Sequence, residues 1–97
     1  EDKVNEDNKY EGVPALIVEV LSPSTKGKDM ITKLNLYMKS GVLEYWIVNP
    51  DSKSISQYTF SRERELESLK DFREGDTIMS TNFAGLEIAL KDIFTAS

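Results

Sequence analysis

The stretch ALIVEVLSPSTKGKD, residues 15–29, joins an apolar run to a turn and then to a basic segment. The run 15–21 predicts a central strand covered on both faces, because near-continuous apolar character is typical of strands buried on both sides. Glu19 interrupts this run close to its end. The SPST turn that follows contains a proline, which cannot continue a strand ladder, and hydroxyl side chains that can cap a helix. The stretch therefore predicts a strand that passes into a helix, with a carboxylate near the end of the strand.

The helix is predicted over residues 26–40, where apolar side chains recur at helical spacing along one face. Gly41 follows it and is a suitable residue for the C-terminal cap. The apolar face consists of Met30, Leu34, Tyr37 and Met38.

The remaining chain is predicted to be rich in strands. The segment 1–12 is polar and acidic and is interpreted as a loop. Strands are predicted at 42–48, 53–60 and 77–80. The pattern of residues 62–72 fits either a helix or a strand. Residues 86–94 are predicted to form a short strand or a short helix. A strand–helix–strand crossover followed by hairpin-linked antiparallel strands predicts an α/β fold with a mixed central sheet.

Composition excludes several classes of function. The 97 residues contain neither cysteine nor histidine, so disulfides, thiolate metal sites, imidazole-based zinc sites and Ser-His-Asp triads are ruled out. Any metal would be a hard cation held by oxygen atoms, such as Mg²⁺ or Mn²⁺. The net charge of −5 argues against nucleic-acid binding over the whole surface. The absence of cysteine favours a cytoplasmic setting. No apolar stretch is long enough to span a membrane, and no signal-peptide pattern is present.

Glu19 and the helix after it form the candidate site. A carboxylate in an apolar strand is costly unless it is paired or binds a cation, and segment 26–39 carries four lysines against one aspartate. A carboxylate and a lysine facing each other suit metal-dependent phosphodiester hydrolysis, in which the lysine stabilises developing negative charge. The alternative is a structural ion pair, with no metal, between Glu19 and either Lys33 or a lysine at the start of the helix, and a lysine strip that is only a solvated helix face.

Three sequence blocks resemble the Uma-two family of endonuclease-like proteins within the PD-(D/E)XK restriction-endonuclease-like superfamily. They are VEVLSPST (18–25), the pattern D-x-x-x-K-x-x-x-Y (29–37) and GVLEYWIV (41–48). The resemblance implies a single restriction-endonuclease-like domain over 1–97 and a Mg²⁺- or Mn²⁺-dependent endonuclease acting on DNA.

The resemblance also assigns roles to individual residues. Glu19 matches the glutamate of the superfamily's Glu-x-Lys motif, but Leu21 occupies the lysine position, and the family places the lysine on the helix as Lys33. Glu19 and Lys33 are therefore the expected catalytic pair, with Glu19 and the carbonyl of Val20 as metal ligands. Further residues implied are Asp29 and Tyr37 in support, and Lys26 and Lys28 as phosphate contacts.

The resemblance implies that one acidic ligand lies upstream of the predicted strand. The chain is expected to lack the domain's N-terminal helix and first catalytic strand, and to be inactive alone. The acidic ligand on that strand is an aspartate in the superfamily, and Asp2 and Asp7 are weak candidates to replace it. The alternative function is an inactive nuclease-like domain that binds nucleic acid or self-associates as a homodimer. Tyr45 and Trp46 should point to opposite faces of their strand and serve in packing.

Overall fold

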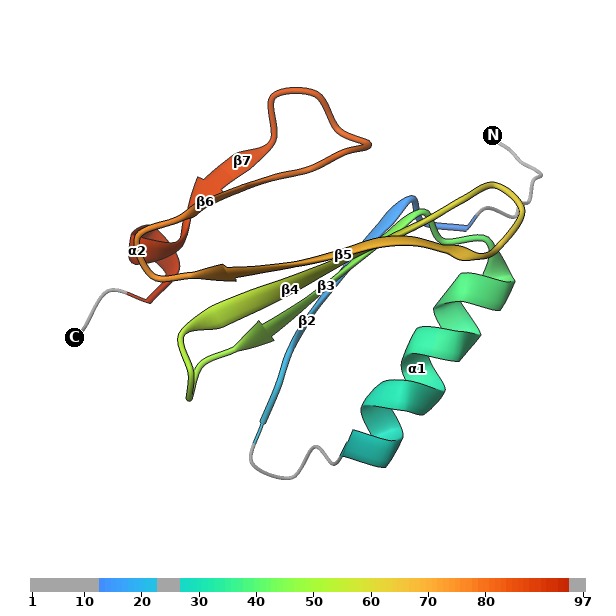
Figure 1. Cartoon of the computed structure of the whole chain (residues 1–97), viewed down its shortest axis with the longest axis horizontal. Coiled ribbons are helices and arrows are strands. Elements are labelled where there is room, and N and C mark those ends of the chain that lie inside the picture. The colour runs from blue at the N-terminus through green and yellow to red at the C-terminus, as the bar shows by residue number, and fades with distance from the viewer. Residues whose placement is uncertain (1–12, 23–26, 95–97) are drawn as a thin grey trace, which may run out of the picture.

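The protein forms one mixed sheet with a helix on one face and a small second sheet on the other (Figure 1). The structure is a computed structural model that describes residues 13–22 and 27–94. None of the helices in these residues combines the length and apolar character needed to cross a membrane. The main sheet has the order β2-β3-β4-β5. Its strands are β2 (Leu16–Val20), β3 (Glu44–Asn49), β4 (Ser54–Phe60) and β5 (Leu66–Arg73).

The predicted mixed α/β fold is confirmed. β2 and β3 pair in parallel and are joined through α1 (Gly27–Ser40), whereas β3, β4 and β5 are antiparallel neighbours joined by hairpins. Most of the ambiguous segment 62–72 belongs to strand β5: residues 62–65 form the turn, and the chain pairs with β4 from Leu66 onward. Residues 86–94 were predicted to form a short strand or a short helix, and they form one after the other: a strand and then one turn of helix.

Helix α1 covers one face of the main sheet and ends at Ser40, with Gly41 directly after it as predicted. Gly41 has a φ of +96°, and Val42 N–H donates to the carbonyl of Tyr37 at 3.1 Å. Together with the bond from Gly41 N–H to the carbonyl of Met38, this is a Schellman cap, which favours glycine because of its positive φ. The core beneath α1 contains the buried residues Val42, Tyr45, Ile47 and Phe60.

The opposite face is covered by β6 (Thr77–Met79), β7 (Glu87–Ala89) and α2 (Leu90–Ile93). β6 and β7 pair as a two-stranded antiparallel sheet. The second core lies beneath them and contains Trp46, Val48, Ile55, Ile78, Leu90 and Phe94. Trp46 and Tyr45 therefore point into different cores, which confirms the prediction that they occupy opposite faces of β3.

A buried carboxylate connects the two sheets. Glu44 is fully buried, and its Oε2 accepts hydrogen bonds from Trp46 Nε1 and from Gln57 Nε2. Its Oε1 accepts bonds from Ser80 Oγ at 2.7 Å and from Asn82 Nδ2 at 3.1 Å. Burial raises the pKa of Glu44, but these hydrogen bonds outweigh it and hold the pKa below 4.5. The ionised carboxylate thus fixes the loop after β6 to the main sheet.

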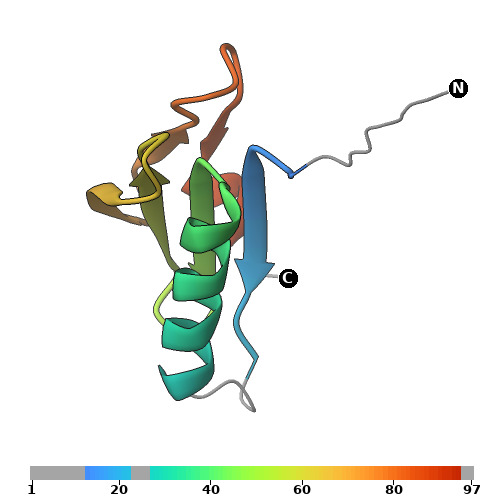
Figure 2. The same ribbon diagram turned by 90° about the vertical axis from the view of Figure 1, so that its right-hand side faces the viewer.

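The prediction that the first strand is central and covered on both faces is wrong within the described residues. β2 lies at one edge of the main sheet, with β3 as its neighbour (Figure 2). Val18 and Val20 are 48% and 64% exposed. Leu16, at the start of the strand, still packs against the second core, so among the described residues the face away from α1 is covered only at the beginning of β2.

Replacing Glu44 with glutamine should destabilise the fold and reduce its sensitivity to acid. The glutamine amide would face hydrogen-bond donors, so the free energy of unfolding at neutral pH should fall by about 1–3 kcal/mol. Because the pKa of Glu44 is lowered on folding, its contribution is present above pH 4.5 and is lost as the pH falls through the folded-state pKa. Urea unfolding followed by circular dichroism from neutral pH downward measures both effects.

The control is Glu74→Gln, which makes the same charge change on an exposed side chain. This variant should keep the wild-type dependence of stability on pH. Equal acid sensitivity in Glu44→Gln and wild type would contradict a stabilising role for the ionised Glu44.

Candidate active site

Glu19 lies on the α1 face of the main sheet, near the C-terminal end of β2. In the parallel register it is opposite Ile47, and Ile17 is opposite Tyr45. Because side chains alternate between faces, Ile17 and Glu19 share the helix-covered face, while Val18 and Val20 point away from it. The apolar pattern that builds the strand thus directs its one carboxylate towards α1.

Three side chains from two other elements meet the Glu19 carboxylate. Lys33 Nζ lies 3.1 Å from Oε2 and 3.4 Å from Oε1. Tyr37 donates its hydroxyl to Oε2 at 3.2 Å, and Tyr45 donates its hydroxyl to Oε1 at 2.9 Å. The structure therefore brings together the predicted residues Glu19, Lys33 and Tyr37, and it adds Tyr45.

Local geometry explains this meeting. Lys33 and Tyr37 are four residues apart in α1, so they occupy one face of the helix and reach the same partner. Tyr45 rises from β3 beneath them, and its ring meets the ring of Tyr37 edge-on with centroids 5.0 Å apart. Tyr45 is only 1% exposed, whereas the Lys33 side chain is 46% exposed. The site therefore has a rigid aromatic floor and a solvent-accessible ammonium group.

The electrostatics keep Glu19 ionised and the tyrosines protonated at neutral pH. Burial raises the pKa of Glu19, but the hydrogen bonds from Tyr45, Lys33 and Tyr37 outweigh it and lower the pKa below the ordinary value. Burial and the adjacent charge of Glu19 raise the pKa values of Tyr37 and Tyr45. A carboxylate held by donors in this way is already ionised, so it does not have to lose a proton before it can interact with a cation.

The backbone next to Glu19 supplies a second oxygen. The carbonyl of Ala15 accepts a bond from Glu44 N–H, and Leu21 N–H donates to the carbonyl of Val48, so these backbone groups of the first strand face β3. Successive residues of a strand alternate in direction, and the carbonyl of Val20 therefore faces the outer edge of the sheet.

This donor set fits Mg²⁺ or Mn²⁺ held largely by water. Residues 13–22 and 27–94 contain no cluster of three carboxylate, histidine or cysteine side chains that could hold a metal. Mg²⁺ is commonly bound through one or two carboxylates, with water and substrate phosphates completing its octahedral shell. Glu19 can provide the carboxylate and Val20 the carbonyl.

Several sequence-predicted residues are not placed by the structure. Lys26, Asp2 and Asp7 lie outside the described residues. Lys28 and Asp29 belong to the first turn of α1, but their side chains are not described. Their predicted roles as phosphate contacts, supporting residue or substitute ligands stay predictions.

Sequence reasoning missed the contact of Tyr45 with the site. It predicted that Tyr45 serves in packing, which is correct for the buried ring but incomplete for the hydroxyl group. The signal that could have found this contact is the alternation of side chains along the strands. With β2 and β3 in their parallel register, Tyr45 lies on the same face of the sheet as Glu19. That register could not be read from either strand alone.

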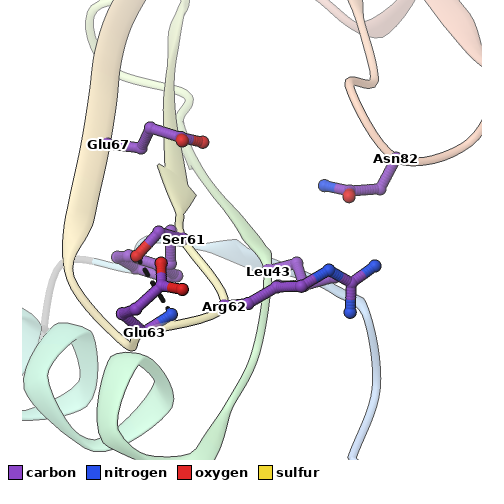
Figure 3. A pocket seen from close by; sticks show the side chains of 7 residues that line it. Leu43, Ser61, Arg62, Glu63, Glu67 and Asn82 are labelled. Atoms are coloured by element: carbon purple, nitrogen blue, oxygen red, sulfur yellow. Dashed lines mark hydrogen bonds between the residues drawn. The ribbon is translucent and has the colours of Figure 1, made fainter.

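A separate hollow lies away from this site, between the β4–β5 hairpin and the loop after β6 (Figure 3). Arg62, Glu63 and Glu67 approach it from the hairpin side, and Asn82 approaches from the loop. Its charged groups are of both signs. None of the four residues assembled at Glu19 lines it.

The sequence matches the model of a known protein family over most of its length. The model of the Uma2 family, described as "Putative restriction endonuclease", matches residues 1–91. The chain belongs to the Uma2 family. The match confirms the resemblance drawn from the three sequence blocks, and no curated protein matches this Uma2 chain.

A solved structure supports the same fold for this Uma2 chain. It is a crystal structure described as a "putative nuclease belonging to DUF820 from Anabaena variabilis ATCC 29413", with 21% sequence identity and a TM-score of 0.68. The match covers 82% of this chain and 43% of the Anabaena chain. The match therefore spans less than half the length of that relative.

Removing the Tyr45 hydroxyl should raise the pKa of Glu19. Tyr45→Phe deletes one of the hydrogen bonds that stabilise the ionised carboxylate and keeps the buried ring. Titration of the Glu19 carboxyl carbon by ¹³C NMR measures the change. Tyr58→Phe is the matched control, since its ring lies 6.1 Å from that of Tyr45 but its hydroxyl is not among the donors to Glu19 described above. An unchanged Glu19 titration in Tyr45→Phe would show that the hydroxyl does not hold the carboxylate.

Proposed function

We propose that Glu19 and Lys33 form part of the active site of a Mg²⁺- or Mn²⁺-dependent endonuclease that hydrolyses DNA phosphodiester bonds. The observation that carries this proposal is the contact between the two side chains at the end of β2, with Lys33 Nζ 3.1 Å from Glu19 Oε2. Membership of the Uma2 family and the nuclease-like fold support it. Both side chains are partly exposed, so a phosphate group can approach them from solvent.

Each side chain of the site has a separate role in the proposed reaction. Glu19 is oriented by the hydroxyl groups of Tyr37 and Tyr45, and it would hold the cation together with the Val20 carbonyl. A bound divalent cation would supply Lewis-acid polarisation of the phosphate and a lowered pKa for its water ligands. Lys33 stabilises the negative charge that develops on the phosphate oxygens in the transition state. Tyr45 holds the carboxylate in place and excludes water from the floor of the site.

The remaining ligands and contacts come from outside this group. Lys26, which lies outside the described residues, and Lys28, in the first turn of α1, are proposed to bind flanking phosphates, as Lys and Arg do in most protein–DNA complexes. Substrate phosphate oxygens, or side chains outside residues 13–22 and 27–94, would complete the cation's shell.

Nicking of supercoiled plasmid tests the proposal. The assay uses the complete encoded protein, including any sequence that flanks residues 1–97, with Mg²⁺, with Mn²⁺ and with EDTA. Glu19→Ala and Lys33→Ala should each lower the nicking rate about 100-fold or more, because each removes a group that acts on the reacting phosphate. Circular dichroism confirms that the variants fold.

Two exposed residues provide charge-matched controls. Glu74→Ala repeats the loss of a carboxylate and Lys39→Ala the loss of an ammonium group on α1, and both should retain wild-type nicking. Cleavage that survives Glu19→Ala would place the chemistry elsewhere. No cleavage by the wild type, combined with DNA retention in a gel shift or with dimers in sedimentation, would instead identify an inactive nuclease-like domain that binds DNA or self-associates.

A further inference from the structure

The Glu19 carboxylate has no acceptor position left for a cation in this structure. A carboxylate offers about four lone-pair positions, two on each oxygen. Oε1 accepts from Tyr45 and Lys33, and Oε2 accepts from Lys33 and Tyr37. A metal ion can therefore ligate Glu19 only if one of these donors leaves.

The three donors differ in how easily they can leave. Tyr45 is buried and packed edge-on against Tyr37, so both hydroxyl groups are fixed by their rings. Lys33 reaches the carboxylate at the end of a flexible four-carbon chain, and nearly half of its side chain is exposed. Its longer bond, 3.4 Å to Oε1, is also the weakest contact of the group. Lys33 is the donor that can move.

The charges of the three donors also favour Lys33 as the one that leaves. The Lys33 ammonium is the positive partner of Glu19 in the resting site, and an arriving cation can replace it without leaving the carboxylate uncompensated. The tyrosines are neutral donors, so the loss of either one would not relieve the repulsion between the ammonium group and an incoming cation.

We propose that the Lys33 ammonium occupies the cation position beside Glu19 in the resting site, and that a divalent cation binds Glu19 only by displacing it. This inference rests on the proposed function and adds an order of events to it. Arrival of the cation releases Lys33 at the moment when a phosphate can use it. Before the cation arrives, Lys33 is held by Glu19 and is not directed at substrate.

Direct titration with MnCl₂ tests this competition without measuring cleavage. Free Mn²⁺ is followed by its EPR signal, with the same complete encoded protein as in the plasmid assay and at physiological ionic strength. Lys33→Met removes the competing ammonium and should bind Mn²⁺ roughly three- to fivefold more tightly than wild type, the factor expected for an exposed ion pair of up to about 1 kcal/mol. Glu19→Gln should abolish this binding in both backgrounds.

Lys39→Met is the matched control for net charge. Lys39 is on the same helix, about 9 Å further along its axis than Lys33, so salt largely screens its effect at Glu19. Its Mn²⁺ affinity should equal that of wild type. An equal increase in Mn²⁺ affinity in Lys33→Met and Lys39→Met would mean that only the net charge of the protein matters, and it would overturn the inference. Glu19-dependent binding that Lys33→Met leaves unchanged, or no Glu19-dependent binding in any variant, would also overturn it.

A second measurement observes the ammonium group itself. In ¹H–¹⁵N spectra of the lysine side chains, saturating Mg²⁺ should shift the Lys33 signal and leave the Lys39 signal in place. An unshifted Lys33 signal at a Mg²⁺ concentration that saturates Glu19 would contradict displacement. The plasmid assay reports on cleavage independently, so a failed competition and a failed nuclease function give different patterns: Glu19-dependent nicking persists in the first and is absent in the second.

Discussion

Hydrogen bonding between β2 and β3 in a fixed parallel register determines where Glu19 lies. The register places Glu19 opposite Ile47 and Ile17 opposite Tyr45. A slip of one residue would turn Glu19 towards the other face together with Ile17 and Leu21, because side chains alternate along a strand. The same pairing requires the crossover through α1, and that helix carries Lys33 and Tyr37. Fold and candidate site therefore depend on one set of backbone bonds.

The two carboxylates near this pairing have opposite surroundings. Glu44 is fully buried on the β6–β7 face and is satisfied by fixed neutral donors, including Trp46 and Ser80. Glu19 is partly exposed, and one of its partners is a flexible ammonium group. A buried carboxylate with only short, fixed partners contributes to structure, whereas one whose partner can leave is available for binding. This difference singles out Glu19 as the residue to which function is assigned.

The sequence predicted the fold well where local patterns were strong. The crossover, α1 with its Gly41 cap and the antiparallel hairpins followed from periodicity and turn residues, and the family motifs brought Glu19, Lys33 and Tyr37 into one hypothesis. It failed where the answer depended on neighbours distant in sequence. Burial of both faces was inferred for the first strand from its own apolar run, but among the described residues β2 is an edge strand, and on its face away from α1 Leu16 packs against the second core while Val18 and Val20 are exposed. The role of the Tyr45 hydroxyl likewise needed the register.

The most direct test of the account is a crystal structure of the protein soaked with Mn²⁺, with anomalous diffraction used to locate the metal. We expect an anomalous peak within coordination distance of a Glu19 oxygen and of the Val20 carbonyl, with Lys33 Nζ displaced from the carboxylate and the tyrosine hydroxyls still in place. Lys33 still bound to Glu19 at a Mn²⁺ concentration that supports cleavage, with the metal peak elsewhere, would contradict the assignment of Glu19 as the cation-binding residue.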